Sequence, residues 1–495
     1  MSNHNDSKIQ TNLLGRFPGN KLDPATLRFV QEYFILDNLA VKLVYLSANE
    51  SYENELAESI TFSESNKTIQ IKLKMAYYSD GSLITATDVA KSFKRAIING
   101  APHIDIDRLF IGASSLKHIN DSIQGIKVID SNTLELNLVQ PTKEILFYFT
   151  LTDLAILHKS QYEKDNLQLN DWSEVTSGPY RLKLGDDSNG PVELIANKKS
   201  FNYSHSMPQT VELHGYKNDN IMQELEKSRY DFGTINFKDY YKNVTRVNKI
   251  EKLQILESQT DGITHIDLNL KSGLFSKVEN RQWVQKKILD NFKVIGEFKA
   301  AAQKSHQFFP PGAKGHIKLK NTKELLKNVE PGNIPEDLKG GFTIKSVKGM
   351  KYYLPEGLDK TLSEILGIKV KIDLSVDSKD YLSFKKDRTF DATIISTSMS
   401  YKVLGEALNL QYMSESPSFL DPTGKIKKLM RSYQSKENLE EEHLILNKIL
   451  TQMVIDSECI PLFYFTSPFF VNHKKLNVDN VNLDESVKFY KMEML

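Results

Sequence analysis

The chain has little that would place it in a specialised class. It contains one cysteine, Cys459, among 495 residues, so an internal disulfide is excluded and cysteine usage does not indicate the redox compartment. It has no run of about 18 apolar residues, which excludes a membrane-spanning helix of the usual kind. Neither sign of charge prevails, because 64 Lys and Arg stand against 63 Asp and Glu. This balance argues against a nucleic-acid-binding protein, which usually carries a basic excess.

The motifs of common enzymes and metal sites are also absent. The sequence contains no GxSxG, HExxH or GxxxxGK[ST] pattern. No two of its 11 histidines stand at the spacing of metal ligands, so we expect neither a metal site nor a cofactor. The alternative is a nickel or haem receptor that gathers histidines from distant parts of the chain. Because no nucleophile or metal constellation can be found, we expect a protein that is not an enzyme.

The most informative stretch covers residues 68–98. Its first part alternates apolar and polar side chains, which predicts a half-buried strand. The apolar face of this strand consists of Ile69, Ile71, Leu73 and Met75. Asp80-Gly81 then indicates a tight turn.

A helix is predicted after this turn. Thr85 and, three residues on, Asp88 form the pattern of an N-terminal capping box. Apolar residues recur from there at helical spacing: Ala86, Val89, Ala90, Phe93, Ala96 and Ile97. We therefore expect a strand, a turn and a capped amphipathic helix that serve as scaffold and carry no chemistry.

This stretch resembles the signature of the family 5 solute-binding proteins, the oligopeptide-, dipeptide- and nickel-type receptors of bacterial ABC importers. The resemblance rests on Ser79-Asp80-Gly81, Thr85-Ala86, Asp88-Val89, Ser92-Phe93 and Arg95-Ala96. Other segments fit the same family: Leu22-Asp23-Pro24, Leu56-Ala57-Glu58-Ser59 and Ser177-Gly178-Pro179-Tyr180. The resemblance extends from about residue 13 to the C-terminus.

The resemblance implies an α/β, periplasmic-binding-protein-like fold, with two lobes that close on a ligand, a hinge and an extra domain. We expect a discontinuous lobe I (1–48, 177–265 and 472–495), an extra domain II (49–176) and a lobe III (266–471). Gly178 and Asn269 are the residues that we expect at the hinge.

The ligand cleft that the resemblance implies departs from the peptide-binding pattern. In peptide-binding members, a strand ends in an acidic residue that pairs with the α-amino group of the ligand. Ser400 stands at this position, and Thr397 stands where a tryptophan is frequent. Arg28 aligns with a residue that is acidic in some peptide receptors, and Val30 with a residue that pairs through its backbone. The other residues expected at the ligand are Lys385, Ser396, Ser398 and Tyr401.

These replacements bear on the ligand's charge. A buried ammonium that lacks its carboxylate costs ~3–5 kcal/mol, roughly a hundredfold or more in affinity. We therefore expect a ligand that is neutral or anionic where peptide receptors hold an amine. Two alternatives stay open. In one, the alignment is displaced by one or two residues, and in the other, Glu406 supplies the acid. Arg28 also has a plainer alternative, an ion pair with Glu32 four residues on along a helix.

The expected function is that of an ABC-importer receptor. It would capture a peptide-like or other small solute by hinge closure and deliver it to the transmembrane permease subunits. We expect a monomer that binds no nucleic acid. The alternative is a cytoplasmic ligand sensor or regulator that reuses the fold. A DNA-binding helix-turn-helix would favour that alternative, and none precedes Leu13.

The N-terminal residues determine the expected location. The polar residues after Met1 cannot form a signal peptide. We expect the native gene to encode a signal segment that ends in a cysteine just before Ser2. The protein would then be a lipoprotein of the periplasm or cell surface, in contact with the membrane only through its lipid anchor.

Overall fold

The computed structural model forms two compact units. Unit 1 consists of Met1–Ile235, Thr245–Glu257 and Phe469–Leu495, and unit 2 of Asn236–Val244 and Ser258–Pro468. The structure describes residues 7–13, 22–26, 30–47, 51–100, 109–142, 145–162, 175–183, 191–215, 221–300, 302–311, 315–330, 332–377, 380–399, 405, 408, 411–413, 417–434, 439–483 and 487–495. Within this part of the chain, no helix is both long and apolar enough to cross a membrane.

The first sheet of unit 1 is built around its most N-terminal strand. Its strands, in spatial order, are β11 (Phe232–Thr234), β1 (Lys8–Leu13), β10 (Thr210–Gly215), β9 (Val192–Ala196) and β8 (Tyr180–Lys183). β1 runs parallel to both of its neighbours, whereas β8 to β10 form an antiparallel meander. The helices of this part are α1 (Val30–Leu39) and α4 (Ile221–Glu226). Helix α5 (Phe237–Val247) lies mostly in unit 2, and its end, from Thr245 on, belongs to unit 1.

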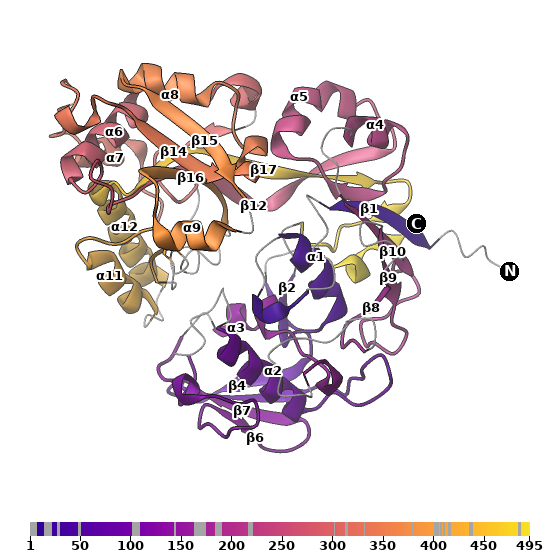
Figure 1. Cartoon of the computed structure of the whole chain (residues 1–495). Coiled ribbons are helices and arrows are strands. Elements are labelled where there is room, and N and C mark those ends of the chain that lie inside the picture. The colour runs from indigo at the N-terminus through magenta and orange to yellow at the C-terminus, as the bar shows by residue number, and fades with distance from the viewer. Residues whose placement is uncertain are drawn as a thin grey trace. The chain divides into compact units, whose positions relative to one another are not determined.

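A second, antiparallel sheet of unit 1 contains the stretch that was most informative in the sequence. Its order is β4 (Ala57–Phe62), β5 (Thr68–Leu73), β7 (Thr133–Asn137) and β6 (Ile126–Val128). Helix α2 (Ala86–Asn99) contacts β6 and β7 (Figure 1). Short elements complete this unit: β2 (Val44–Leu46), β3 (Tyr52–Asn54), α3 (Ile145–Tyr148), β18 (Leu476–Asn477) and β19 (Glu493–Met494).

The predicted strand, turn and helix are confirmed, with one exception. Thr85 and Asp88 form the capping box at the start of α2, and Gly100 ends the helix in the left-handed conformation. Ile69, Ile71 and Leu73 are buried as expected, but Met75 is 76% exposed. The prediction for Met75 was wrong because β5 ends at Leu73, and beyond the ladder the alternation of faces no longer holds.

Unit 2 is a mixed sheet flanked by helices. Its strands, in spatial order, are β15 (Val370–Val376), β14 (Phe342–Val347), β16 (Ala392–Met399), β12 (Leu253–Leu268) and β17 (Cys459–Asn472), and β13 (Gln303–Lys304) also pairs with β17. Its helices are α6 (Val278–Asn291), α7 (Leu319–Leu325), α8 (Leu358–Leu366), α9 (Tyr381–Asp387), α11 (Lys425–Gln434) and α12 (Leu439–Asp456). The α/β class expected from the sequence is confirmed.

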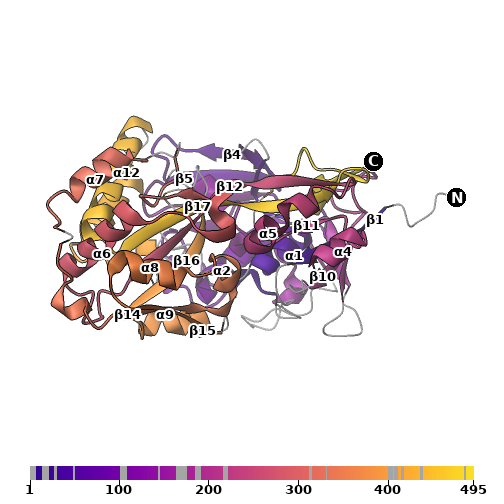
Figure 2. The same ribbon diagram turned by 90° about the horizontal axis from the view of Figure 1, so that it is seen from above.

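Two long strands belong to both units. β12 passes from unit 1 into unit 2 at Glu257–Ser258, and β17 passes back at Pro468–Phe469 (Figures 1 and 2). β11 pairs with the end of β17 in unit 1, where Phe232 lies opposite Val471. The two units are therefore linked by continuous strands. The division into three parts with the boundaries given above stays a prediction.

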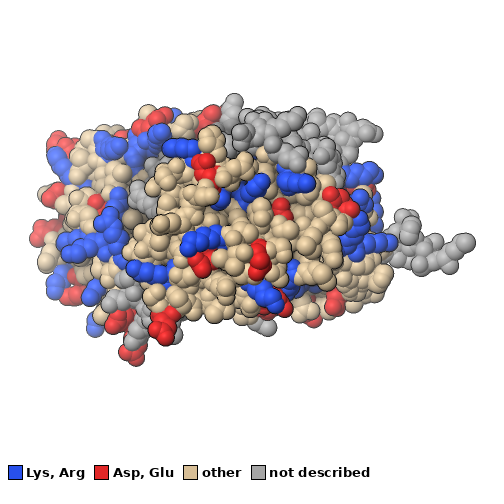
Figure 3. Space-filling model, turned by 90° about the horizontal axis from the view of Figure 1, so that it is seen from below, with Lys and Arg blue, Asp and Glu red and all other residues tan. Residues whose placement is uncertain are grey.

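The charges that are drawn in Figure 3 reflect the even composition. On the face shown there, Lys and Arg side chains are interspersed with Asp and Glu across a larger uncharged surface. Charged side chains pair locally at many places among the described residues, as in the bond from Lys242 to Glu356 at 2.7 Å and the bond from Lys277 to Asp337 at 2.7 Å. No field of one sign covers this face among the described residues, which is unlike the surface that binds a polyanion.

Candidate functional site

Strand β16 carries three of the residues that we predicted at the ligand. It pairs antiparallel with β12, so that Ser396 lies opposite Thr264 and Thr397 opposite Ile263. The Ser396 hydroxyl lies 2.8 Å from that of Thr264, and Thr397 Oγ1 lies 3.1 Å from His265 Nε2. Both Ser396 and Thr397 are half-buried. Each hydroxyl thus has a partner in the sheet and still presents part of its surface to solvent.

Several predicted residues lie outside the described part of the chain. The backbone of Ser398 pairs with Gly262, and Val30 is the first residue of α1, but neither side chain is described. The others in this group are Arg28, Ser400 and Tyr401. The replacement of the amine-binding acid, which depends on these residues, stays a prediction.

Lys385 lies on α9 next to an aromatic ring. Its Nζ is 5.6 Å from the ring centre of Tyr381, a distance at which a cation interacts with the ring. Burial lowers the pKa of the Lys385 amine, and the nearby carboxylate of Asp267 opposes this effect. A partly desolvated ammonium can pair strongly with an anionic group. Its contact with a ligand stays a prediction.

The two residues that we predicted at the hinge are held tightly within single units. Gly178 donates its N–H to the carbonyl of Leu39 at 2.8 Å, and a Cβ at Gly178 would lie 2.5 Å from the Leu39 carbonyl carbon. The side-chain amide of Asn269 donates to the carbonyls of Arg388 and Phe390 at 2.9 and 2.7 Å. These contacts explain why the two residue types are needed there. The hinge role itself stays a prediction.

A buried polar cluster that was not predicted from the sequence lies beside Thr397. His265 Nδ1 is 2.6 Å from Asp267 Oδ1, and the Cys459 thiol lies close to both. One ligand atom from each of these three residues lies within 4.8 Å of the other two. The alternation of a strand could have placed His265 and Asp267 on one face, but nothing in the sequence indicated Cys459.

This cluster does not form the active site of a cysteine enzyme. A thiol, an imidazole and a carboxylate are the groups of such a site. Here, however, His265 is 0%, Asp267 2% and Cys459 5% exposed, so that no substrate reaches them. Burial also raises the pKa of the Cys459 thiol well above its usual value, which keeps it protonated and unreactive.

A second buried acid precedes Cys459. Glu458 accepts hydrogen bonds from the backbone N–H groups of Leu420 and Asp421, at 2.8 and 3.0 Å. Burial nevertheless dominates and raises the pKa of Glu458 to about 7. The side chain ties the segment before α11 to the start of β17.

Comparisons with known proteins agree with this architecture. Residues 51–416 match the family described as bacterial extracellular solute-binding proteins, family 5 Middle. The peptide transport periplasmic protein SapA of Salmonella typhimurium is 25% identical over 166 residues, which is 32% of this chain. That match spans 27% of the length of SapA.

Two solved structures show the same fold over nearly the whole chain. Haemophilus influenzae OppA, in complex with the peptide RPPGFSPFR, has a TM-score of 0.79 at 16% identity and covers 99% of each chain. The binding protein AgaA of A. tumefaciens R10, in complex with agropinic acid, has a TM-score of 0.75 at 18% identity and also covers 99% of each chain. The periplasmic-binding-protein-like fold expected from the sequence is thus confirmed. With a family match that covers most of its length, the chain belongs to the family 5 bacterial extracellular solute-binding proteins.

Proposed function

We propose that this protein is the substrate receptor of an ABC importer, which captures a small solute between two lobes and delivers it to a membrane permease. The observation that carries this proposal is the family match over residues 51–416, joined to a fold that superposes on ligand-bound receptors over 99% of the chain. Its action would be binding without chemical turnover.

The chain connections support closure by a hinge. β12 and β17 each continue from one unit into the other, so that a few residues near Glu257 and Pro468 can take up a change in backbone angles. Hinges of this kind are typical of proteins that close around a ligand.

The ligand that we propose is neutral or anionic at the place where peptide receptors hold an amine. Arg28 would offer a fixed positive charge and a planar fork for a carboxylate or phosphate. Lys385 would add a second cation, and the hydroxyls of Ser396 and Thr397 would donate or accept without charge. The complex of AgaA with agropinic acid shows that this fold is not confined to peptides.

The location that we propose is outside the cytoplasm. The family is described as extracellular, and SapA is described as periplasmic. A monomer attached to the membrane through a lipid would place the ligand site next to the permease. Light scattering of the purified protein and membrane fractionation of the native host measure these two properties.

Native mass spectrometry followed by calorimetry tests the ligand. The purified protein is first inspected for a retained ligand. Wild type and Arg28→Ala are then titrated with a mixed peptide pool and with a pool of acidic metabolites. We expect binding from the acidic pool that Arg28→Ala weakens. Arg181→Ala, which removes an exposed arginine from β8, is the matched control and should bind like wild type.

Two results would contradict different parts of the proposal. Tight binding of free-amine peptides that Arg28→Ala does not alter would overturn the ligand class and leave the receptor function intact. Uptake of the bound solute that is unchanged in a host lacking this protein would overturn the receptor function itself.

A further inference from the structure

We propose that His265, Asp267 and Cys459 form a buried site for a transition-metal cation of the Zn²⁺ type. Their three ligand atoms lie within 4.8 Å of one another, and the side chains are 0%, 2% and 5% exposed. The site lies within unit 2 and does not depend on the proposed transport function. It goes against our expectation from the sequence, where no histidine pair had ligand spacing.

The sheet brings these residues together from distant parts of the chain. His265 and Asp267 are two residues apart on β12, and so lie on the same face. The N–H of Leu268 donates to the carbonyl of Glu458 at 2.8 Å, which places Cys459 beside Asp267 at the start of β17. On the other side of β12, Thr397 of β16 reaches the imidazole of His265. Backbone pairing thus fixes the three donors without any contribution from loops.

The donor set matches a borderline divalent cation. Zn²⁺ is bound in proteins by imidazole nitrogen, carboxylate oxygen and thiolate sulfur, most often in a tetrahedral arrangement. A carboxylate and a thiolate would together balance the two charges of the metal. A buried dication with two anionic ligands and one neutral ligand therefore leaves no net charge in the low dielectric of the interior.

Two buried polar atoms near the cluster lack a partner among the described residues. One is Asp267 Oδ2, on the carboxylate that contacts His265. The other is the phenol oxygen of Tyr412, whose ring packs against Phe419 beside the imidazole of His265. Buried polar atoms nearly always have a partner, and each exception requires a reason. A cation held by Asp267 supplies the partner that this carboxylate oxygen lacks.

The imidazole is already oriented for a metal. His265 Nδ1 faces the carboxylate, while Nε2 lies 3.1 Å from Thr397 Oγ1. Metal-binding histidines usually donate their second ring N–H to a neighbouring acceptor, which fixes the ring and its tautomer. With a metal at Nδ1, Nε2–H would donate to the Thr397 hydroxyl. The aromatic rings of Phe308 and Phe419 pack against the imidazole and exclude water.

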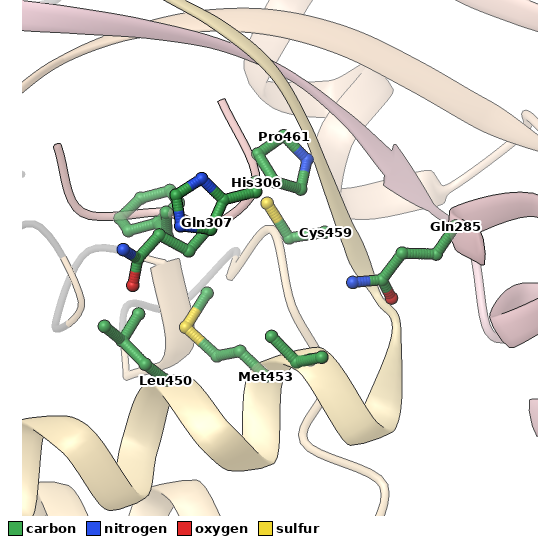
Figure 4. A pocket seen from close by; sticks show the side chains of 9 residues that line it. Gln285, His306, Gln307, Leu450, Met453, Cys459 and Pro461 are labelled. Carbon is green, nitrogen blue, oxygen red and sulfur yellow. The ribbon is translucent and has the colours of Figure 1, made fainter. Parts of the chain in front are cut away.

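Binding requires a small movement and the release of two protons. The 2.6 Å between His265 Nδ1 and Asp267 Oδ1 is the length of a hydrogen bond, whereas two ligands at ~2.0 Å from a tetrahedral metal lie about 3.3 Å apart. The cation would replace the proton between these groups, and Cys459 would lose its thiol proton. Cys459 also lines a small cavity between β17 and α12, with Met453 and His306 (Figure 4). This cavity leaves space in which the Cys459 side chain can move.

Some nearby charges oppose the binding of a cation and one favours it. Lys385 and Arg388 lie close enough to Asp267 to interact with its charge, and they oppose a cation. Glu458 precedes Cys459, and its carboxylate would attract a cation once it has lost its proton. The two basic groups and the acid set the affinity of the site without removing any ligand from it.

Titration with the metal alone tests this inference. The protein is stripped with a chelator and then titrated with Co²⁺ or Zn²⁺. We expect one equivalent of Co²⁺ to produce the charge-transfer absorption of a cobalt–thiolate bond, and Zn²⁺ to displace it. Cys459 is the only cysteine and is buried, so a thiol reagent reacts with it only when the fold opens locally, and bound Zn²⁺ should slow this reaction.

Variants separate this site from adventitious binding. Cys459→Ser should abolish the charge-transfer band, and Asp267→Asn should weaken Zn²⁺ binding at least tenfold. Thr397→Val should weaken it about 10- to 100-fold, with recovery in Thr397→Ser. His316→Gln is the control, since it removes an imidazole that is not part of the proposed site but could bind a metal together with His306, whose ring centre is 5.4 Å away. It should bind like wild type.

Two outcomes would overturn the inference. The first is the absence of a cobalt–thiolate band together with thiol labelling that Zn²⁺ leaves unchanged in wild type. The second is Zn²⁺ binding that Asp267→Asn does not alter or that His316→Gln abolishes. If Cys459→Ser fails to fold, thiol labelling of wild type and Asp267→Asn still decides the question.

Discussion

Asp23 and Arg95 form a two-pronged ion pair. Arg95 Nη1 donates to Asp23 Oδ1 at 2.8 Å, and Nη2 donates to Oδ2 at 2.6 Å. Asp23 belongs to the Leu-Asp-Pro segment and Arg95 to helix α2, two segments that carry the family resemblance in the sequence. The guanidinium is only 1% exposed, so this fork ties the two segments together inside unit 1.

Removing one partner of this pair should destabilise unit 1. We expect Asp23→Asn to lower the free energy of unfolding by about 3 kcal/mol, because the arginine is left buried without its carboxylate. Arg95→Lys keeps the charge but loses the fork, and should also destabilise. Urea unfolding of both single variants and of Asp23→Asn with Arg95→Gln measures the coupling. Strictly additive losses would contradict a direct interaction.

The capping box of α2 should contribute less to the stability of the protein than the pair of Asp23 with Arg95. Thr85→Ala removes the side-chain acceptor for the Asp88 N–H and should cost about 1 kcal/mol of stability. Thr85→Ser keeps the hydroxyl and serves as the control. Thermal unfolding followed by circular dichroism measures both. Equal stability of the two variants would show that the side-chain contact contributes nothing.

The packing at Gly178 predicts a clear contrast between two glycines. In Gly178→Ala the new methyl group would lie 2.5 Å from backbone atoms of Leu39, which cannot move as a flexible side chain does. We expect a loss of about 1–3 kcal/mol in the free energy of unfolding. Gly273→Ala is the matched control, since no atom lies within 4 Å of its Cβ. Unfolding of both variants at the same denaturant concentration would contradict the close packing at Gly178.

The buried Glu458 predicts a pH dependence of stability. Burial raises its pKa from 4.5 to about 7 in the folded protein. The folded state therefore keeps the proton over a range in which the unfolded chain has lost it. This contribution is complete below pH 4.5 and is lost as the pH rises from there to about 7. The free energy of unfolding that is lost over this pH range is about 3 kcal/mol.

Variants with glutamine isolate this effect. Glu458→Gln cannot titrate, so its stability should fall less steeply than that of wild type between pH 4.5 and about 7. Glu364→Gln, which changes an exposed glutamate on α8, should retain the wild-type slope. Urea unfolding at several pH values gives both slopes. A wild-type slope in Glu458→Gln would mean that another group is responsible.

Local patterns could be predicted from the sequence, whereas partners from distant segments could not. The capping box and the alternating strand depend on residues within a few positions of one another, so their spacing was sufficient. Met75 was placed wrongly because alternation alone does not indicate where a ladder ends. The pair of Asp23 with Arg95 depends on tertiary packing, and so does the approach of Cys459 to His265. Family resemblance supplied the fold, but the residues that it implied at the ligand stay predictions.

The path of β17 has a consequence for how the protein is made. Phe469–Leu495 belongs to unit 1 and supplies core residues such as Val471, Val487 and Phe489 to it. A chain still on the ribosome therefore carries this core of unit 1 unfinished. The second core of unit 1, built from residues between Val41 and Ile156, and the continuous segment Ser258–Pro468 do not need the final residues. Exposed apolar surface of this kind promotes aggregation or binds chaperones. The segment that is synthesised last thus completes a core that also contains some of the first residues, such as Ile9 and Leu22, and loss of the final residues would leave that core incomplete.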